Sequence, residues 1–159
     1  MTHLVTRGST GKDITGTNAS FFVNGKPVPQ GSLKFINGHA IHVRAQDLAL
    51  WRADIARIAR SVINQPAEEG VEIYLTFNVK KPKTVNRNEP YIRPDIDKLA
   101  RAVLDGLTGV AYRDDEQVVK LTAIKQYAET EGVQIRFVDK KKLALSLEKP
   151  EKVINEYYD

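Results

Sequence analysis

A change of hydrophobic period in the first half of the chain constrains the fold more than any other feature. Between residues 46 and 63, apolar side chains recur every three or four positions, which is the spacing that lines one face of an α-helix. Residues 71 to 79 then alternate strictly between apolar and polar types, as expected of a strand with one buried face. The segment between these patterns contains Pro66 and Gly70 and ends the helix. The two patterns together predict a helix packed on a β-sheet.

A second helix is predicted over residues 95–107, which carry another apolar stripe. Pro94 suits the start of this helix and Gly109 is placed to end it. The preceding residues 80–94 are punctuated by prolines and are predicted to form a loop.

The remaining regular structure is predicted to be β. Residues 117–127 and 133–138 favour strands and are expected to pair as a hairpin across the Glu131-Gly132 turn. Shorter strands are expected at residues 21–23, 33–36 and 39–43. The fold class is therefore α+β (mixed α/β), a small mixed sheet with two main helices packed on it.

A chain of 159 residues is long enough for one domain and short for two. We expect residues 1–19 to be a flexible leader, residues 20–138 to form the domain, and residues 139–159 to be a C-terminal extension of uncertain structure. Within this extension, alternation of leucines resembles a strand at Leu143, Leu145 and Leu147.

Composition narrows the class of protein. The chain has 24 Lys and Arg against 20 Asp and Glu, and this net charge of +4 makes a polyanion a reasonable partner without identifying one. Cysteine is absent, which excludes disulfides, Cys-ligated metals and thiol nucleophiles and fits a reducing compartment. No apolar run approaches the roughly 18 residues of a membrane span, so we expect a cytoplasmic protein without a membrane partner.

Acidic residues form the most informative pattern. Asp95 and Asp97 lie two apart where extended chain passes into a helix, so both side chains can point the same way, and Asp114 and Asp115 follow across that helix. If the later pair packs beside the helix start, the carboxylates converge and must take up protons or hold a cation. Oxygen ligands suit Mg²⁺ or Mn²⁺. The alternative is that Asp95 merely caps the helix.

Basic residues flank this pattern. Asp97, Arg101 and Asp105 are four apart and share a helix face, so a guanidinium lies one turn from the first carboxylate pair, and Asp105 is expected to have a structural role, for example pairing with Arg101. A divalent ion beside a fixed positive charge suits phosphoryl transfer. The residues predicted to neutralise nucleic-acid phosphates are Lys80, Lys81, Lys83, Arg87, Arg93 and Lys98.

Four segments resemble the RusA family of Holliday junction resolvases. They are Arg93-Pro94-Asp95-Ile96-Asp97, the helix end Leu104-Asp105-Gly106-Leu107-Thr108-Gly109, Asp114-Asp115 with Gln117-Val118-Val119, and the opening Phe21-Phe22-Val23-Asn24-Gly25-Lys26-Pro27-Val28-Pro29-Gln30-Gly31. The resemblance covers roughly residues 20 to 138.

The resemblance implies a homodimer, encoded by bacteria or their phages, that cuts four-way DNA junctions symmetrically with Mg²⁺ and uses no organic cofactor. Asp95, Asp97 and Asp115 match the family's essential carboxylates, and Asp114 takes the neighbouring acidic position. These four are the expected metal ligands. The expected catalytic residues are Asp95, Asp97 and Asp115 together with Arg101.

Two positions depart from the family pattern. The resolvases commonly carry an essential Lys at the position of Arg101 and often Asn at the position of Lys98. Arg101 keeps the positive charge but cannot release a proton at working pH. Two alternatives therefore stay open, namely a non-cleaving protein that binds branched DNA around a structural metal, and a nuclease that prefers flaps or replication forks.

Overall fold

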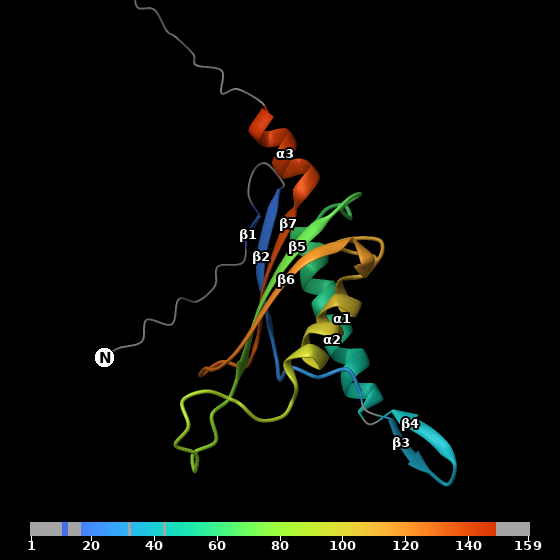
Figure 1. The fold of residues 1–159 in the computed structure, drawn as a ribbon, viewed down its shortest axis with the longest axis vertical. Helices are drawn as coiled ribbons and strands as arrows, with labels where there is room; N and C mark the ends of the chain where they lie inside the picture. Colours follow the sequence, from blue (N-terminus) through green and yellow to red (C-terminus); the bar gives the residue numbers. More distant parts are fainter. Residues whose placement is uncertain (1–10, 13–16, 32, 43, 149–159) are drawn as a thin grey trace, which may run out of the picture.

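The computed structural model describes residues 11–12, 17–31, 33–42 and 44–148 (Figure 1). Its helices are α1 (Ala45–Val62), α2 (Ile96–Leu107) and α3 (Lys140–Glu148), with a short 3₁₀ turn η1 (Asp115–Gln117). The strands are β1 (Gly11–Lys12), β2 (Asn18–Asn24), β3 (Leu33–Ile36), β4 (His39–His42), β5 (Val71–Val79), β6 (Val118–Tyr127) and β7 (Gly132–Asp139). The predicted helices over residues 46–63 and 95–107 and the predicted strand over 71–79 are confirmed.

A mixed five-stranded sheet forms the body of the protein, with strand order β1-β2-β7-β5-β6. β5 pairs antiparallel with β7 on one side and parallel with β6 on the other. β3 and β4 form a separate antiparallel hairpin that projects from the body (Figure 1). The predicted α+β class, with a small mixed sheet and two main helices on it, is confirmed.

The predicted hairpin of residues 117–127 and 133–138 is wrong. β5 lies between β6 and β7, so Leu75 is paired with Ala123 on one side and with Ile135 on the other. The connection crosses the end of β5, where the amide of Ala128 donates a hydrogen bond to the carbonyl of Val79 at 3.0 Å. Two strand spacings amount to roughly 10 Å and four extended residues reach about 13 Å, so the short connection can skip a strand.

The core lies between this sheet and the two long helices, which cover the same face of it (Figure 1). Trp51 and Ile55 of α1 are buried there with Leu99 of α2 and Leu75 and Phe77 of β5. A β-carbon at Gly106 would lie 3.1 Å from Ile55 Cγ2 and 3.3 Å from the carbonyl oxygen of Arg52. The glycine therefore allows α1 and α2 to pack closely, which fixes the position of α2.

Both ends of the described chain differ from expectation. Gly11–Lys12 pairs with Ala19 and Ser20, and β2 begins at Asn18, so part of the predicted leader belongs to the sheet. The leucines that alternate after Asp139 lie in helix α3, which has no buried residue. Residues 1–10, 13–16 and 149–159 of the predicted leader and extension lie outside the described residues.

None of the helices in the described part of the chain is both long enough and apolar enough to cross a bilayer.

Candidate active site and basic groove

Asp95 stands at the junction between the 80–94 loop and α2. Its backbone is extended, with φ −70° and ψ 138°, and its side chain makes no capping hydrogen bond to the helix. The carboxylate is exposed and lies 3.6 Å from the ammonium of Lys98. The structure therefore does not support capping as the role of this side chain, and the carboxylate can face a ligand.

The backbone around Asp95 is held from two sides. The ammonium of Lys125 on β6 donates hydrogen bonds to the carbonyls of Ile92 at 2.6 Å and Pro94 at 2.9 Å. On the helix side, the amide of Gln30 donates to the carbonyl of Lys98 at 2.9 Å. Neither partner was predicted from the sequence. Lys125 carried a signal in the sequence, because its charge interrupts the apolar alternation of residues 119–127.

Asp97 and Arg101 lie in the first and second turns of α2, and both are exposed. Asp105, one turn further, pairs with Arg52 of α1 at 2.7 Å and not with Arg101 as predicted. Arg52 also donates a hydrogen bond to the side-chain carbonyl of Gln30. Asp105 thus joins the two helices, which is a structural role, and Arg101 is not engaged by it.

The second acidic pair begins the η1 turn. Asp114 Oδ1 accepts a hydrogen bond from the amide of Glu116 at 3.1 Å. Gln117 supports this turn, because its side-chain oxygen accepts from the amides of Arg113 at 2.9 Å and Asp114 at 3.1 Å. The side-chain nitrogen of Gln117 donates to the carbonyls of Ala67 and Glu69 at 2.9 and 3.0 Å. Gln117 therefore fixes the acidic turn to the segment that precedes β5.

The electrostatic environment of Asp115 links this turn to α2. Partial desolvation, a hydrogen bond with Asp114, and the negative charges of Asp114 and Asp105 raise the pKa of the Asp115 carboxyl, while the charge of Arg101 lowers it. Nearby, the hydroxyl of Tyr112 donates to the carbonyl of Leu104 at 2.7 Å. Burial and the charge of Asp115 raise the pKa of Tyr112. The acidic turn thus packs beside the middle and last turns of α2.

The predicted convergence of three or four carboxylates is not seen in a single chain. Among the residues that the structure describes, no three His, Asp or Glu side chains lie close enough together to hold one metal ion. On α2, the charged groups that influence Asp115 are Arg101 and Asp105, and Asp95 precedes this helix. The donor type nevertheless fits Mg²⁺, because all four candidate ligands are carboxylates.

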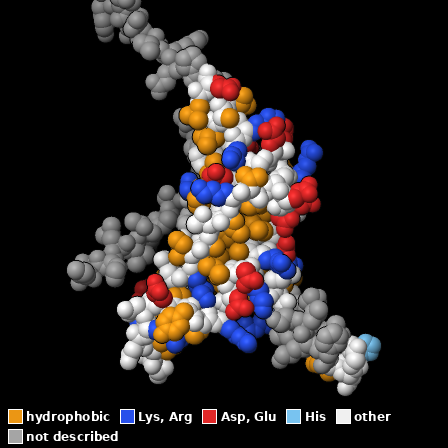
Figure 2. All heavy atoms as spheres, viewed as in Figure 1, with side chains coloured by type: hydrophobic (Ala, Val, Ile, Leu, Met, Phe, Trp, Pro, Cys, Tyr) orange, Lys and Arg blue, Asp and Glu red, His pale blue; other side chains and the backbone are white. Residues whose placement is uncertain are grey.

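Asp95 and much of the 80–94 loop line a basic groove of about 890 Å³. Five of the predicted phosphate-binding residues line it, namely Lys80, Lys81, Lys83, Arg93 and Lys98. The lining also includes three cations that sequence reasoning missed, Lys26, Arg44 and Lys125. Among the residues that the structure describes, only two acidic side chains, Asp95 and Glu131, belong to the lining. Figure 2 shows basic and acidic side chains together near the 80–94 loop and the start of α2.

Arg87, the remaining predicted phosphate-binding residue, has other contacts. Its Nε donates a hydrogen bond to the hydroxyl of Tyr127 at 2.7 Å, and its guanidinium lies 5.7 Å from the centroid of the Tyr91 ring.

Among the described residues, eight cations line this groove with the exposed Asp95 and with Glu131, and such an excess of cations is typical of proteins that bind nucleic acids. The family model of the endodeoxyribonuclease RusA matches residues 24–137. This span is 114 of the 159 residues, and the chain therefore belongs to the RusA family of endodeoxyribonucleases. The match includes every residue predicted for the site and confirms the predicted family.

One curated relative is similar over much of its length. The uncharacterized protein YqaN of Bacillus subtilis (strain 168) is 29% identical over 130 residues, which cover 72% of this chain and 92% of the relative.

Proposed function

We propose that this protein is a Mg²⁺-dependent endonuclease that resolves Holliday junctions by paired, symmetric cleavage of phosphodiester bonds. The observation that carries the proposal is the position of Asp95, which is exposed and lines a groove together with eight cations of the described chain, in a member of this family. Such a groove holds phosphates, and the carboxylate lies where one of those phosphates would reach. We place this activity in the cytoplasm.

Asp95, Asp97, Asp114 and Asp115 are the proposed ligands for Mg²⁺, with Mn²⁺ as its substitute. Mg²⁺ in nucleotide enzymes is commonly held by one or two carboxylates together with substrate phosphates, so the full set need not be complete before DNA binds. When bound, the ion supplies charge for the scissile phosphate and lowers the pKa of a coordinated water.

Arg101 is proposed to stabilise negative charge on the phosphate during cleavage. It is exposed on the same helix as Asp97, one turn further on, and its charge acts on Asp115. A guanidinium is protonated at all working pH values, so Arg101 can stabilise charge but cannot act as a general base. Proton removal from the attacking water therefore falls to a carboxylate or to solvent.

The cations that line the groove are proposed to bind the backbone of the DNA arms. The proposed phosphate-binding cations of the groove include five that were predicted from the sequence, namely Lys80, Lys81, Lys83, Arg93 and Lys98. Two more, Lys26 and Arg44, come from the segments before β3 and after β4. Contacts to phosphates carry no sequence information and weaken with salt. Arg87 is proposed to contribute to DNA binding through Tyr91 and Tyr127, the two tyrosines that it contacts.

Two symmetric cuts require two sites, and a two-fold homodimer supplies them. We propose that the second copy packs on β6, which is the edge strand of the sheet and exposes 62% of Val119 and 43% of Leu121. Figure 2 shows hydrophobic side chains gathered midway along this face.

Leu121→Glu should convert a dimer into a monomer in light scattering, whereas Thr122→Glu on the same strand should not. A monomeric wild-type protein would contradict this part of the proposal.

The direct test is Asp97→Asn with a synthetic four-way junction. Cleavage should fall by at least about a hundredfold, a loss of the size seen when a group that stabilises the transition state is removed. Junction binding should persist or strengthen, because the candidate site loses a negative charge that repels phosphates. Asp47→Asn, an exposed acid in the first turn of α1, is the matched control and should cleave normally. Full cleavage by Asp97→Asn would overturn the assignment.

The replacement of the family lysine by Arg101 favours a second candidate function, a non-cleaving protein that binds branched DNA. Purified protein that binds junctions but never nicks them with Mg²⁺ or Mn²⁺, even after Arg101→Lys, would establish it. A comparison of junctions with flaps and forks in the same assay separates a resolvase from a nuclease for other branched DNA.

A further inference from the structure

We propose that Tyr91 is a stacking platform for a nucleobase exposed at the branch point, so that the 80–94 loop distinguishes branched DNA from duplex. The proposal rests on the proposed function and adds a base contact to a groove that otherwise offers phosphate contacts.

Tyr91 presents its ring to solvent at the rim of the groove. Its side chain is 76% exposed, whereas the residues on either side, Pro90 and Ile92, line the groove. The backbone at this point is ordered by a hydrogen bond from the amide of Tyr91 to the carbonyl of Glu89 at 3.0 Å. An aromatic ring is therefore held in water beside the path proposed for the DNA backbone.

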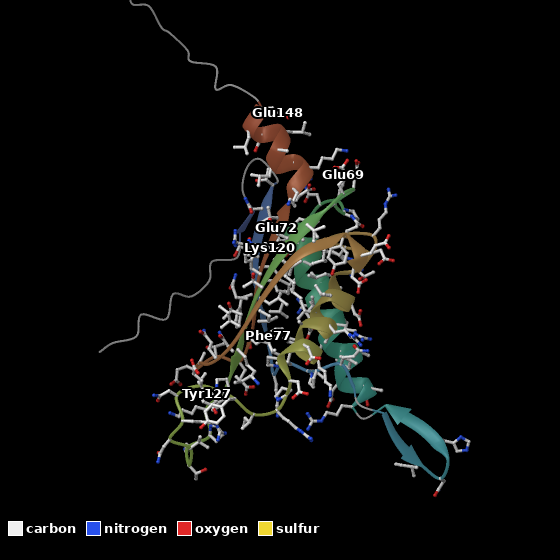
Figure 3. All side chains as sticks on the ribbon, in the orientation of Figure 1. Glu69, Glu72, Phe77, Lys120, Tyr127 and Glu148 are labelled. Carbon is white, nitrogen blue, oxygen red and sulfur yellow. The ribbon has the colours of Figure 1, made fainter. Side chains whose placement is uncertain are left out.

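The ring belongs to a cluster in which aromatic and cationic groups alternate. Arg87 lies between two tyrosines, with its guanidinium 5.7 Å from the Tyr91 ring centroid and its Nε bonded to the Tyr127 hydroxyl at 2.7 Å. On the other side of the cluster, the ammonium of Lys81 lies 5.9 Å from the Tyr127 ring centroid. Tyr127 is labelled in Figure 3, at the end of β6 beside the loop. Arg87 is thus fixed by Tyr127 while it faces Tyr91.

Aromatic faces accompanied by cations are the means by which proteins bind unpaired nucleotides. Bases stack on the rings, and neighbouring Arg and Lys side chains bind the phosphates and add cation–π attraction. In a duplex every base is already stacked between its neighbours, so its face is not available to Tyr91. At a branch point a base can leave the stack at a smaller cost than in a duplex. The platform therefore adds affinity for branched DNA alone.

Tyr91 also lies four residues before Asp95 in a segment that Lys125 ties to the sheet through the carbonyls of Ile92 and Pro94. A base stacked on Tyr91 would be held at a set distance from the site carboxylates. Stacking therefore positions the branch point relative to the proposed cleavage site.

The test compares Tyr91→Ala, Tyr91→Phe and the exposed loop control Thr84→Ala in EDTA, so that no cleavage occurs. Binding is measured with a labelled four-way junction and with a duplex of the same arm sequence. Tyr91→Ala should weaken junction binding by about tenfold or more and duplex binding by less than about twofold, because one stacked base is lost only from the junction. Tyr91→Phe should keep the junction preference, since the ring remains.

A second readout uses 2-aminopurine, a fluorescent base, at the branch point. Wild type should change its fluorescence on binding, and Tyr91→Ala should not. Equal losses of affinity for junction and duplex in Tyr91→Ala would overturn the proposal. No loss of affinity for either DNA would also overturn it, and would leave Tyr91 as a contact for another macromolecule. A wild type without junction preference or cleavage would instead refute the proposed function, so the two failures are distinguishable.

Discussion

The ammonium of Lys125 donates a hydrogen bond to the carbonyl of Pro94 at 2.9 Å, across 31 positions of sequence. Pro94 immediately precedes Asp95, a carboxylate in the lining of the basic groove. The same ammonium binds the carbonyl of Ile92 at 2.6 Å. A charged group on β6 thus sets where the chain leaves the loop and enters α2.

Lys125→Met is expected to slow junction cleavage by about tenfold or more, because each hydrogen bond to a charged group contributes roughly 1.5–3 kcal/mol and two carbonyls lose their donor. The loss should fall mainly on kcat, since the groove keeps its other cations. Lys125→Arg should restore part of the rate. The control is Lys120→Met on the same strand. The Lys120 ammonium lies 5.4 Å from the centroid of the Tyr74 ring, and Lys120 pairs with Glu72 at the start of β5, whereas the 80–94 loop follows the end of β5. A normal kcat in a folded Lys125→Met variant would contradict a positioning role.

Local patterns predicted the elements of this fold but not the order of its strands. The hydrophobic periods of α1, α2 and β5 arise because one face of each element is buried. These periods can be recognised in the sequence without knowing which element packs against that face. The hairpin prediction failed because β6 and β7 have the same patterns whether they pair with each other or flank β5. Only the pairing itself, with β5 bonded on both edges, settles the choice.

The candidate site was likewise predicted in its local features but not in its contacts between distant parts of the sequence. The residue types at positions 95, 97, 114 and 115 were identified from a motif, which is local. Lys125 and Arg52 were missed because their partners, Pro94 and Asp105, lie 31 and 53 positions away. The packing of Asp115 near Arg101 and Asp105 depends on how the chain returns after α2, which no spacing rule specifies.

Gly132→Ala is expected to destabilise the sheet. A β-carbon at this position would collide with the Phe22 ring and with the carbonyl oxygen of Val23, so the backbone of β2 would have to move. Overpacking of this kind costs roughly 1–3 kcal/mol in the free energy of unfolding, which urea denaturation measures. At the control position, Gly70, a β-carbon would meet Val119 Cγ1 at 3.4 Å, an ordinary contact with an exposed side chain. Equal stability of the two variants would show that β2 adapts freely.

The ion pair between Arg52 and Asp105 is expected to couple α1 to α2. The two side chains are 32% and 34% exposed and lie 2.7 Å apart, so solvent screens part of the attraction. A double-mutant cycle with Arg52→Met and Asp105→Asn should give a coupling of about 1 kcal/mol in the free energy of unfolding. The more exposed Arg57–Asp54 pair, at 3.4 Å within α1, should give about 0.3 kcal/mol or less. A coupling for Arg52–Asp105 no larger than that of the control pair would mean that Gly106 packing alone holds the helices together.

The attachment of α3 is expected to weaken in acid. This helix buries no residue, and its first turn is tied to the body by Lys141, whose ammonium lies 2.7 Å from Glu68 and 3.7 Å from Glu69. The hydrogen bond and charge of Lys141 lower the pKa of Glu68 from its usual 4.5. A lowered pKa in the folded state means that the pair contributes stability above pH 4.5, and that this contribution is lost as the pH falls through the lower folded value.

Amide hydrogen exchange measures this attachment directly, with α1 as the internal reference. Protection of α3 should decrease relative to α1 as the pH is lowered through the titration of Glu68, after correction for the intrinsic exchange rate. Lys141→Met should reduce protection at neutral pH and flatten its pH dependence, because Glu68 then has lost its main partner. Two other contacts at the start of α3 remain in Lys141→Met: Asp139 accepts a hydrogen bond from the amide of Lys142 at 3.1 Å, and the ammonium of Lys140 lies 3.8 Å from Glu72. A pH dependence of α3 protection that survives in this variant would assign the effect to these contacts. Lys142→Met, whose side chain has only a minor influence on Glu68, should behave like wild type.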